Sequence, residues 1–135
     1  MYTMKEVCSQ VGITYETLRF YCNEGLVPHV KRDKNNYRDF DQKNINWLKS
    51  LQCLKKCGMG IKEMKQYMNL CLGGASTIPE RKRLLAHQKE FLLGKIIEIN
   101  ESIDFIDRKQ ETFDGILAGE IPYTSNLIRT DEETL

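Results

Sequence analysis

The chain has 135 residues, 41% hydrophobic and 29% charged, which is typical of one folded domain with or without an extension. No apolar run approaches the roughly 18 residues of a membrane-spanning helix, and the N-terminus lacks the basic region and apolar block of a signal peptide. We therefore expect a cytoplasmic protein with no membrane partner. The net charge of +1 hides an asymmetry: residues 1–70 carry 12 basic and 7 acidic side chains, whereas residues 71–135 carry 8 and 12. This division suits a polyanion-binding head on a solvated body, and chance scatter is the alternative.

Five cysteines, an odd number, lie in the first 71 residues. A secreted disulfide scaffold would pair them densely in a loop-rich chain, whereas this chain looks helical, so we expect reduced thiols. The two histidines, His29 and His87, are isolated. With no Gly-rich phosphate loop and no Ser/His/Asp or metal-ligand grouping, the sequence predicts no enzyme, no cofactor and no metal site.

Two short helices open the chain. Thr3 and Glu6 predict a capping box, apolar residues follow at helical spacing, and Gly12 is placed to end the first helix. Thr14 caps a second helix that runs towards Gly25. Together they form a helix-turn-helix pattern over residues 4–23, with an ordinary helical hairpin as the alternative. Against that alternative stand four hydrogen-bonding side chains on the short second helix: Tyr15, Thr17, Arg19 and Tyr21.

The next segment, "VPHVKRDKNNYRDF", predicts a hairpin over residues 30–40. Val30 and residues 37–40 are candidate strands, and Asn35 and Asn36 suit the turn because Asn tolerates the left-handed conformation. The hairpin is basic, since it carries Lys31, Arg32, Lys34 and Arg38. A basic hairpin directly after a helix-turn-helix is a wing, whose cationic groups neutralise phosphates.

A second pair of helices is predicted over residues 42–70. Asp41 is placed as the N-cap of its first helix and Gly58 ends that helix. The following helix has an apolar face of Ile61, Met64 and Met68. Gly73 and Gly74 break the chain there, so we place the N-terminal domain at residues 1–72.

A long helix is predicted over residues 76–117, with Thr77 and Glu80 as a capping box and no proline after Pro79. Its length is about 58 Å, and its apolar residues recur at heptad spacing, which predicts a coiled coil. Because the chain has no second long helix, we expect a homodimer, and the repeat alone leaves the helix direction open. Residues 118–135 are expected to form a short, loosely ordered tail. The seam residues are Leu85, Leu92, Ile96, Ile99, Ile103, Ile106 and Phe113.

The stretch "YTMKEVCSQVGITYETLRFYCNEGLVP" resembles the N-terminal signature of the MerR family of bacterial transcription regulators. "RDKNNYRDF" looks like that family's first wing, and "LKKCGMGIKEMKQYM" looks like its second helix pair. The resemblance covers about the first 117 residues. It implies a mainly α fold, in which a winged helix-turn-helix domain precedes a long dimerisation helix in an antiparallel coiled coil. It also implies a regulator that bends and untwists promoter DNA so that the elements read by RNA polymerase realign.

The resemblance further implies which residues contact DNA. Residues 14–22 look like the recognition helix of the major groove, with Arg19 as the leading base or phosphate contact. The start of the fourth helix looks like a second wing, where backbone N–H groups favour phosphate. The family commonly has Glu where Cys22 stands. The candidate contacts are Thr14, Tyr15, Thr17, Arg19, Tyr21, Arg32, Tyr37, Arg38, Lys56, Ile61 and Lys62.

Cys53 is a candidate for the thiol at which the signal acts. "GGASTIPERKRLLAHQKEFL" and the place of Cys53 resemble the branch of the family that answers to aldehydes, electrophiles and thiol stress. Lys49 and Lys56, one turn away on either side, favour a thiolate, whereas the C-terminal end of the helix disfavours an anion. The alternatives are that Cys53 packs against the partner's long helix, or that it binds a metal.

Other signals of the family find little support. No cysteine follows Cys71, so the metal-binding loop of metal-sensing members is absent. About 18 residues follow Leu117, too few to enclose a drug-binding pocket. A second function stays open, that of a helical adaptor or sequestering protein that uses the coiled coil without DNA. The basic N-terminal half argues against it.

Overall fold

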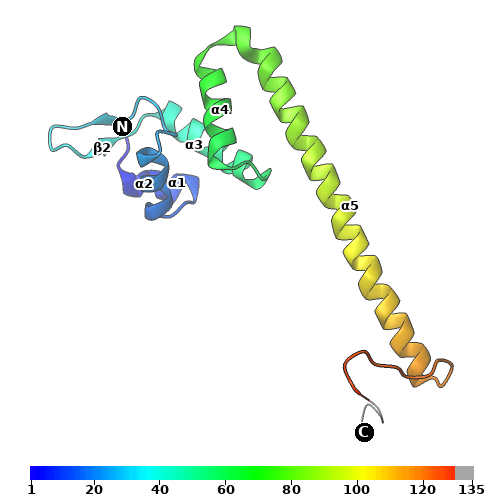
Figure 1. The fold of residues 1–135 in the computed structure, drawn as a ribbon. Coiled ribbons are helices and arrows are strands. Elements are labelled where there is room, and N and C mark those ends of the chain that lie inside the picture. The colour runs from blue at the N-terminus through cyan, green and yellow to red at the C-terminus, as the bar shows by residue number, and fades with distance from the viewer. Residues whose placement is uncertain (130–135) are drawn as a thin grey trace. The chain divides into compact units, whose positions relative to one another are not determined.

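The computed structural model describes residues 1–129 and is mainly α-helical, as predicted (Figure 1). The chain forms two compact units, Met1–Leu92 and the part from Leu93 onward. Among the described residues, no helix has the length and apolar character needed to cross a membrane. The elements in chain order are α1 (Met4–Val11), α2 (Tyr15–Asn23), β1 (Lys31–Arg32), β2 (Arg38–Asp39), α3 (Gln42–Lys56), α4 (Ile61–Leu72), the 3₁₀ turn η1 (Ala75–Thr77) and α5 (Ile78–Leu117).

The predicted caps fix the two helices of the helix-turn-helix. At α1, the Glu6 amide donates to Thr3 Oγ1 (3.2 Å) and the Thr3 amide donates to Glu6 Oε1 (2.9 Å), which confirms the capping box. Gly12 ends α1 at φ 79°, a left-handed conformation that glycine adopts without a Cβ penalty. Thr14 then accepts from the Thr17 amide at the start of α2. The tight turn between α1 and α2 is therefore specified by residues within it.

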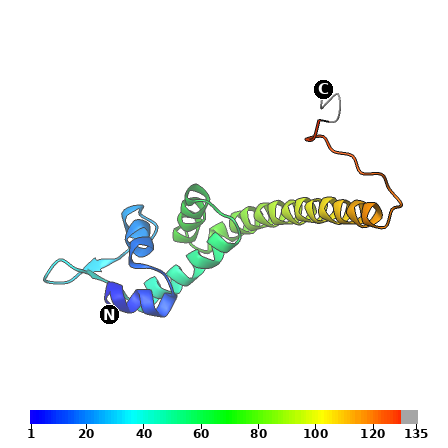
Figure 2. The ribbon, with the colours of Figure 1, turned by 90° about the horizontal axis from the view of Figure 1, so that it is seen from below.

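The predicted hairpin is confirmed, and its strands are short. β1 and β2 are antiparallel, with Arg32 opposite Arg38. In the turn, Asp33 Oδ1 accepts from the amides of Asn35 and Tyr37, and Asn36 takes a left-handed φ of 65°. In Figures 1 and 2 this hairpin projects from the body formed by α1 and α2. Its tip therefore lies free of the hydrophobic core.

Two polar side chains tie α3 to the loop that follows α2. Trp47 Nε1 donates to the carbonyl of Leu26 (2.7 Å), and the buried Asn44 donates to the carbonyl of Pro28 (3.1 Å). Asn44 also accepts from the amide of Asp41, which completes a capping box at the start of α3. These bonds fix α3 relative to the loop between α2 and the hairpin. Around these contacts lies one buried cluster: Val7, Leu18, Tyr21, Leu26, Val27, Phe40, Ile45, Leu48, Leu51, Leu54, Met59 and Met64.

The predicted capping box at the start of the long helix is wrong. Because η1 runs directly into α5, Thr77 stands in a continuous helical path and not in the extended conformation of an N-cap. Its Oγ1 instead lies 2.5 Å from the carbonyl oxygen of Leu70 and accepts from Arg81 Nε (3.0 Å). Glu80 pairs with Arg83 (2.9 Å). The hydroxyl therefore serves the end of α4.

The first turns of α5 belong to the N-terminal unit. Leu84 packs against the buried cluster, and Gln88 Nε2 donates to the carbonyl of Cys57 (2.6 Å), just after the last residue of α3. A Cβ on Gly58 would lie 3.3 Å from Gln88 Nε2 and 3.4 Å from Phe91. The glycine at this position therefore lets α5 approach the end of α3 closely.

The far end of α5 is closed by a Schellman motif. The Glu120 amide donates to the carbonyl of Gly115 (2.9 Å), Gly119 takes φ 77°, and Ile121 covers Gly115 so closely that a Cβ there would overlap it. The start of the predicted tail is thus more ordered than expected. Residues 122–129 form no helix or strand, and residues 130–135 of the tail lie outside the described part.

Candidate nucleic-acid interface

Helix α2, which the family resemblance implies as the recognition helix, has one buried and one exposed face. Leu18 and Tyr21 point into the core, with 0% and 2% of their surface exposed. Tyr15 and Phe20 are exposed, and Arg19 is exposed beside them. The outward face therefore presents Arg19 and two aromatic rings over two turns, with the exposed carboxylate of Glu16 among them. Arginine and aromatic side chains suit the groove of a nucleic acid.

The side chains at the start of α2 are partly engaged with one another. Thr14 donates its hydroxyl to Thr17 Oγ1 (2.9 Å) and accepts from the Thr17 amide (3.1 Å). Thr14 therefore serves as the helix cap, whichever other contact it makes. The guanidinium carbon of Arg19 lies 5.9 Å from the centre of the Tyr15 ring, within the range of a cation–π interaction.

The ring of Tyr21 packs in the core, and its hydroxyl has no hydrogen-bond partner among the described residues. Burial raises the pKa of the Tyr21 phenol, so the group stays neutral. The spacing of three residues from the buried Leu18 accounts for the burial of the ring. Tyr21 also lines the open pocket between α2 and the start of α4, and its phosphate contact stays a prediction.

The base of the wing is joined to the end of α2. Arg38 Nη2 donates to Asn23 Oδ1 (2.8 Å), and Arg32 Nη1 donates to the carbonyl of Asn36 (2.8 Å) within the hairpin. Tyr37 is 70% exposed. The structure thus brings the predicted wing residues Arg32, Tyr37 and Arg38 to one hairpin and ties that hairpin to the end of α2. The Arg38–Asn23 bond joins residues 15 apart in sequence, and no local pattern predicts it.

Cys22 lies between α2 and the wing and is half-buried. Burial raises the pKa of the Cys22 thiol, and the positive charges of Arg38 and Arg32 act in the opposite direction. Since burial is the larger effect, the thiol stays protonated at neutral pH. Cys22 is therefore a neutral packing residue at the place where the family commonly has Glu.

A second cationic element lies at the start of α4, where the carboxylate of Glu63 is also close to Gly60. Gly60 is the N-cap and supplies no side-chain hydrogen bond, so amide groups at this helix end lack an internal partner. Lys56 and Lys62 are exposed on either side. Ile61 packs against the core, so any anion contact it makes uses its backbone amide. An open pocket of about 440 Å³ separates this end from α2, lined by Thr17, Phe20, Lys55, Gly60 and Ile61 among others.

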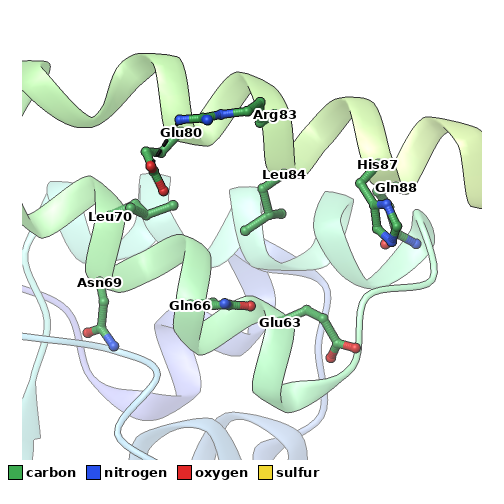
Figure 3. A pocket seen from close by; sticks show the side chains of 9 residues that line it. All are labelled: Glu63, Gln66, Asn69, Leu70, Glu80, Arg83, Leu84, His87 and Gln88. Atoms are coloured by element: carbon green, nitrogen blue, oxygen red, sulfur yellow. Dashed lines mark hydrogen bonds and ion pairs between the residues drawn. The ribbon is translucent and has the colours of Figure 1, made fainter.

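Another open pocket, of about 630 Å³, lies between α4 and the first turns of α5 (Figure 3). Glu63, Gln66 and Asn69 line it from α4. From α5, Arg83 and His87 line it, and Figure 3 shows the Glu80–Arg83 ion pair at one end. Its lining mixes acidic, basic and amide groups. In residues 1–129 no three His, Cys, Asp or Glu side chains lie close enough together to hold a metal ion.

Cys53 is exposed on α3, as its place on the helix predicts, and the other four cysteines are half-buried. Lys49 and Lys56 are also exposed. Burial raises the pKa of the Cys8 thiol, and Cys71 lies beside the hydroxyl of Tyr67. All five cysteines are free thiols. The exposure of the predicted sensor thiol thus differs from that of the others.

Comparison with known proteins identifies the family of the chain. The family described as "MerR HTH family regulatory protein" matches residues 2–71. An uncharacterized HTH-type transcriptional regulator of Haemophilus influenzae is 38% identical over 108 residues, 80% of each chain. The HTH-type transcriptional regulator AdhR of Bacillus subtilis is 37% identical over 88 residues, 65% of this chain and 63% of its own. The match thus includes the recognition helix and the wing.

Solved structures of MerR family regulators are also similar to this chain. The crystal structure of HiNmlR, described as a MerR family regulator lacking the sensor domain and bound to promoter DNA, superposes with a TM-score of 0.70 at 35% identity. That alignment covers 89% of this chain and 91% of HiNmlR. A MerR family structure from Listeria monocytogenes superposes with a TM-score of 0.74 at 26% identity, over 88% and 90% of the two chains. The chain belongs to the MerR family of DNA-binding transcription regulators.

Proposed function

We propose that this regulator binds promoter DNA as a homodimer, with α2 of each protomer in the major groove of one half-site. The observation that carries this proposal is the bond between Arg38 and Asn23, which ties the basic wing to the recognition helix (2.8 Å). A recognition helix and a wing held together can enter a groove and contact its phosphates as one unit. Further contacts to the DNA backbone are assigned to three exposed side chains, Arg32, Tyr37 and Lys62.

The dimer proposal rests on the apolar seam of α5. Leu92 and the seam residues beyond it are 36% to 57% exposed in the single chain, a row of apolar side chains that water disfavours. The charge along α5 supports an antiparallel pair. Residues 78–97 carry 5 basic and 2 acidic side chains, whereas residues 98–117 carry 2 and 6. Antiparallel pairing sets each basic half against an acidic half, and parallel pairing sets like charges together.

One antiparallel register pairs every seam position. It sets Ile99 against the partner's Ile103, Ile96 against the partner's Ile106, and Leu85 against the partner's Leu117, with the two-fold axis near residue 101. Lys89 then faces Phe113, and Gln110 faces Leu92. The stems of these two polar residues can cover the opposing apolar groups while their heads reach water.

We infer that regulation uses deformation of the promoter. Each α5 is about 60 Å long, so a paired coiled coil is a stiff spacer that sets the distance between two recognition helices. DNA whose half-sites do not match that distance must bend or untwist to contact both. By family resemblance, this change presents the promoter to RNA polymerase.

Binding to DNA is tested by its dependence on salt. The probe is a fluorescent duplex that the protein selects from a random-sequence library. With Arg32 and Arg38 of both protomers on phosphates, the slope of log K against log salt is expected to be about −3.6 or steeper. Fluorescence anisotropy from 50 to 300 mM salt measures it, and energy transfer between dyes at the duplex ends measures bending. An affinity indifferent to salt would contradict phosphate contacts, and unchanged energy transfer would contradict deformation.

We propose Cys53 as the point where an aldehyde, electrophile or thiol stress acts. Its thiol is exposed, and it lies one turn from Lys56 at the start of the second cationic element. An α,β-unsaturated aldehyde supplies the simplest reaction. The Cys53 thiolate attacks the β-carbon, a C–S bond forms, and the resulting enolate takes a proton from water. An adduct there adds bulk within one turn of a proposed phosphate contact.

Acrolein provides the test of this thiol. Wild-type protein treated with substoichiometric acrolein is expected to carry its first adduct on Cys53 by peptide mass spectrometry, with a changed affinity for the selected duplex. Cys8 and Cys22 are expected to react more slowly, because burial raises their pKa values and reduces the thiolate fraction. Cys53→Ser removes the response, and Cys71→Ser is the matched control that keeps it. An undiminished response in Cys53→Ser would eliminate the sensor role.

A further inference from the structure

The exposed face of α2 holds a pair of side chains whose joint role is not explained by the fold. Tyr15 is the first residue of α2, is 53% exposed, and is absent from the buried cluster. Arg19 follows one turn later, with its guanidinium carbon 5.9 Å from the Tyr15 ring centre. Within residues 1–129 no hydrogen bond or ion pair engages Arg19. The five N–H donors of its guanidinium are therefore available while its cationic plane lies near an aromatic ring.

The geometry of the helix produces this arrangement. Side chains on a helix lean towards its N-terminus, so Arg19 lies back over the turn that contains Tyr15. The negative face of the ring attracts the guanidinium, and the contact narrows the range of conformations open to a long side chain. Thr14 caps the helix directly before Tyr15, so the backbone at Tyr15 is helical. The contact with the ring therefore favours conformers of Arg19 that lie over Tyr15 before any ligand binds.

We propose that Tyr15 is a positioning residue for sequence recognition: its ring holds Arg19 so that the guanidinium fork meets O6 and N7 of one guanine in each half-site. An arginine fork matches this pair of acceptors and no other base edge of the major groove. A lysine ammonium group would not need to be aligned in this way, because it acts as a point charge and binds phosphate from many directions. The proposal rests on the proposed function, in which α2 enters the major groove.

Two substitutions separate the ring from the hydroxyl. Tyr15→Phe keeps the ring and removes the hydroxyl. Tyr15→Leu removes the ring while retaining a strong helix former. If the ring positions Arg19, Tyr15→Phe reads DNA as the wild type does, and Tyr15→Leu does not. If instead the Tyr15 hydroxyl contacts DNA itself, both variants lose the same selectivity, and that result overturns the proposal.

The experiment is selection from a random-sequence duplex library, followed by sequencing, with wild type, Tyr15→Phe, Tyr15→Leu and Arg19→Ala. Wild type and Tyr15→Phe are expected to enrich one guanine at symmetric positions of the two half-sites. Tyr15→Leu is expected to lower discrimination at that position by about two- to five-fold, with other positions and the salt dependence unchanged. Unchanged thermal unfolding of Tyr15→Leu shows that α2 is intact. Undiminished discrimination of guanine by Tyr15→Leu would overturn the proposed role of Tyr15 in positioning Arg19.

The Arg19→Ala variant distinguishes a failure of the Tyr15 proposal from a failure of the proposed function. If Arg19→Ala loses the guanine preference and Tyr15→Leu keeps it in full, the proposed function stands and the role of Tyr15 fails. If Arg19→Ala keeps the wild-type motif, Arg19 does not read a base, and the recognition that Tyr15 would support fails with it. Loss in Arg19→Ala with partial loss in Tyr15→Leu supports both.

Discussion

Ile103→Asp is expected to dissociate the dimer. In the antiparallel register, each Ile103 faces the partner's Ile99 near the two-fold axis, so one substitution changes two neighbouring layers. Losing two buried isoleucines costs about 3–6 kcal/mol, before the cost of burying two carboxylates is added. The dimer dissociation constant should therefore rise by at least about 100-fold, as measured by analytical ultracentrifugation. Affinity for a two-half-site duplex should fall with it.

Ile97→Asp is the matched control for this change. Ile97 is 60% exposed on α5 and stands outside the heptad seam, so the same chemical change should leave the dimer intact. Equal dissociation by both variants would show that the helix, and not the seam, is disturbed.

The direction in which the two α5 helices pair is tested in a background without native cysteines. An equimolar mixture of Leu85→Cys and Leu117→Cys chains should cross-link, whereas Leu85→Cys alone should cross-link only in a parallel pair.

Joint replacement of Arg19 and Arg38 by alanine is expected to abolish specific binding and to leave the dimer intact. A bidentate arginine–guanine contact contributes about 1–3 kcal/mol to discrimination, and a dimer contains two of them. Loss of Arg38 removes a proposed phosphate contact and the bond that ties the wing to Asn23. Affinity for the selected duplex at 0.15 M salt should fall by at least about 100-fold. Fluorescence anisotropy measures this loss.

Single replacement of Arg19 or Arg38 is expected to change different properties of DNA binding. Arg38→Ala should reduce the slope of log K against log salt by about 2 for the dimer, whereas Arg19→Ala should mainly flatten the preference between sequences. Arg108→Ala combined with Arg129→Ala removes the same number of positive charges from exposed positions outside the interface. A comparable loss of binding in that control would attribute the effect to net charge and not to the interface.

Much of the fold could be predicted because its signals are local. The capping box of Thr3 and Glu6, the left-handed Gly12 and the Asp41 cap depend on residues within one turn of each other, so a short window contains the whole interaction. Asn36 is a comparable case in the wing turn. The Tyr15–Arg19 contact also falls within one turn at i, i+4 spacing, although it was not among the predictions made from the sequence.

The failures occurred where a residue's environment comes from distant segments. Thr77 has the spacing of a capping box, but the close end of α4 and the 3₁₀ turn before α5 redirect its hydroxyl to Leu70. The place of the Tyr21 ring likewise depends on distant segments, because it packs in the core formed with α1, α3 and α4. Helical spacing gives the face of a residue, and the tertiary packing decides which face is buried.

The sequence by itself determined the order of the helices, the wing, the long apolar seam and membership of the MerR family, because each follows from periodicity or from a motif of adjacent residues. Only the tertiary structure decided how the parts proposed to contact DNA are joined. Arg38 meets Asn23 across the base of the wing, and Gln88 meets the carbonyl of Cys57 at the end of α3. Both bonds join residues far apart in the chain, and their geometry depends on the packed core between them.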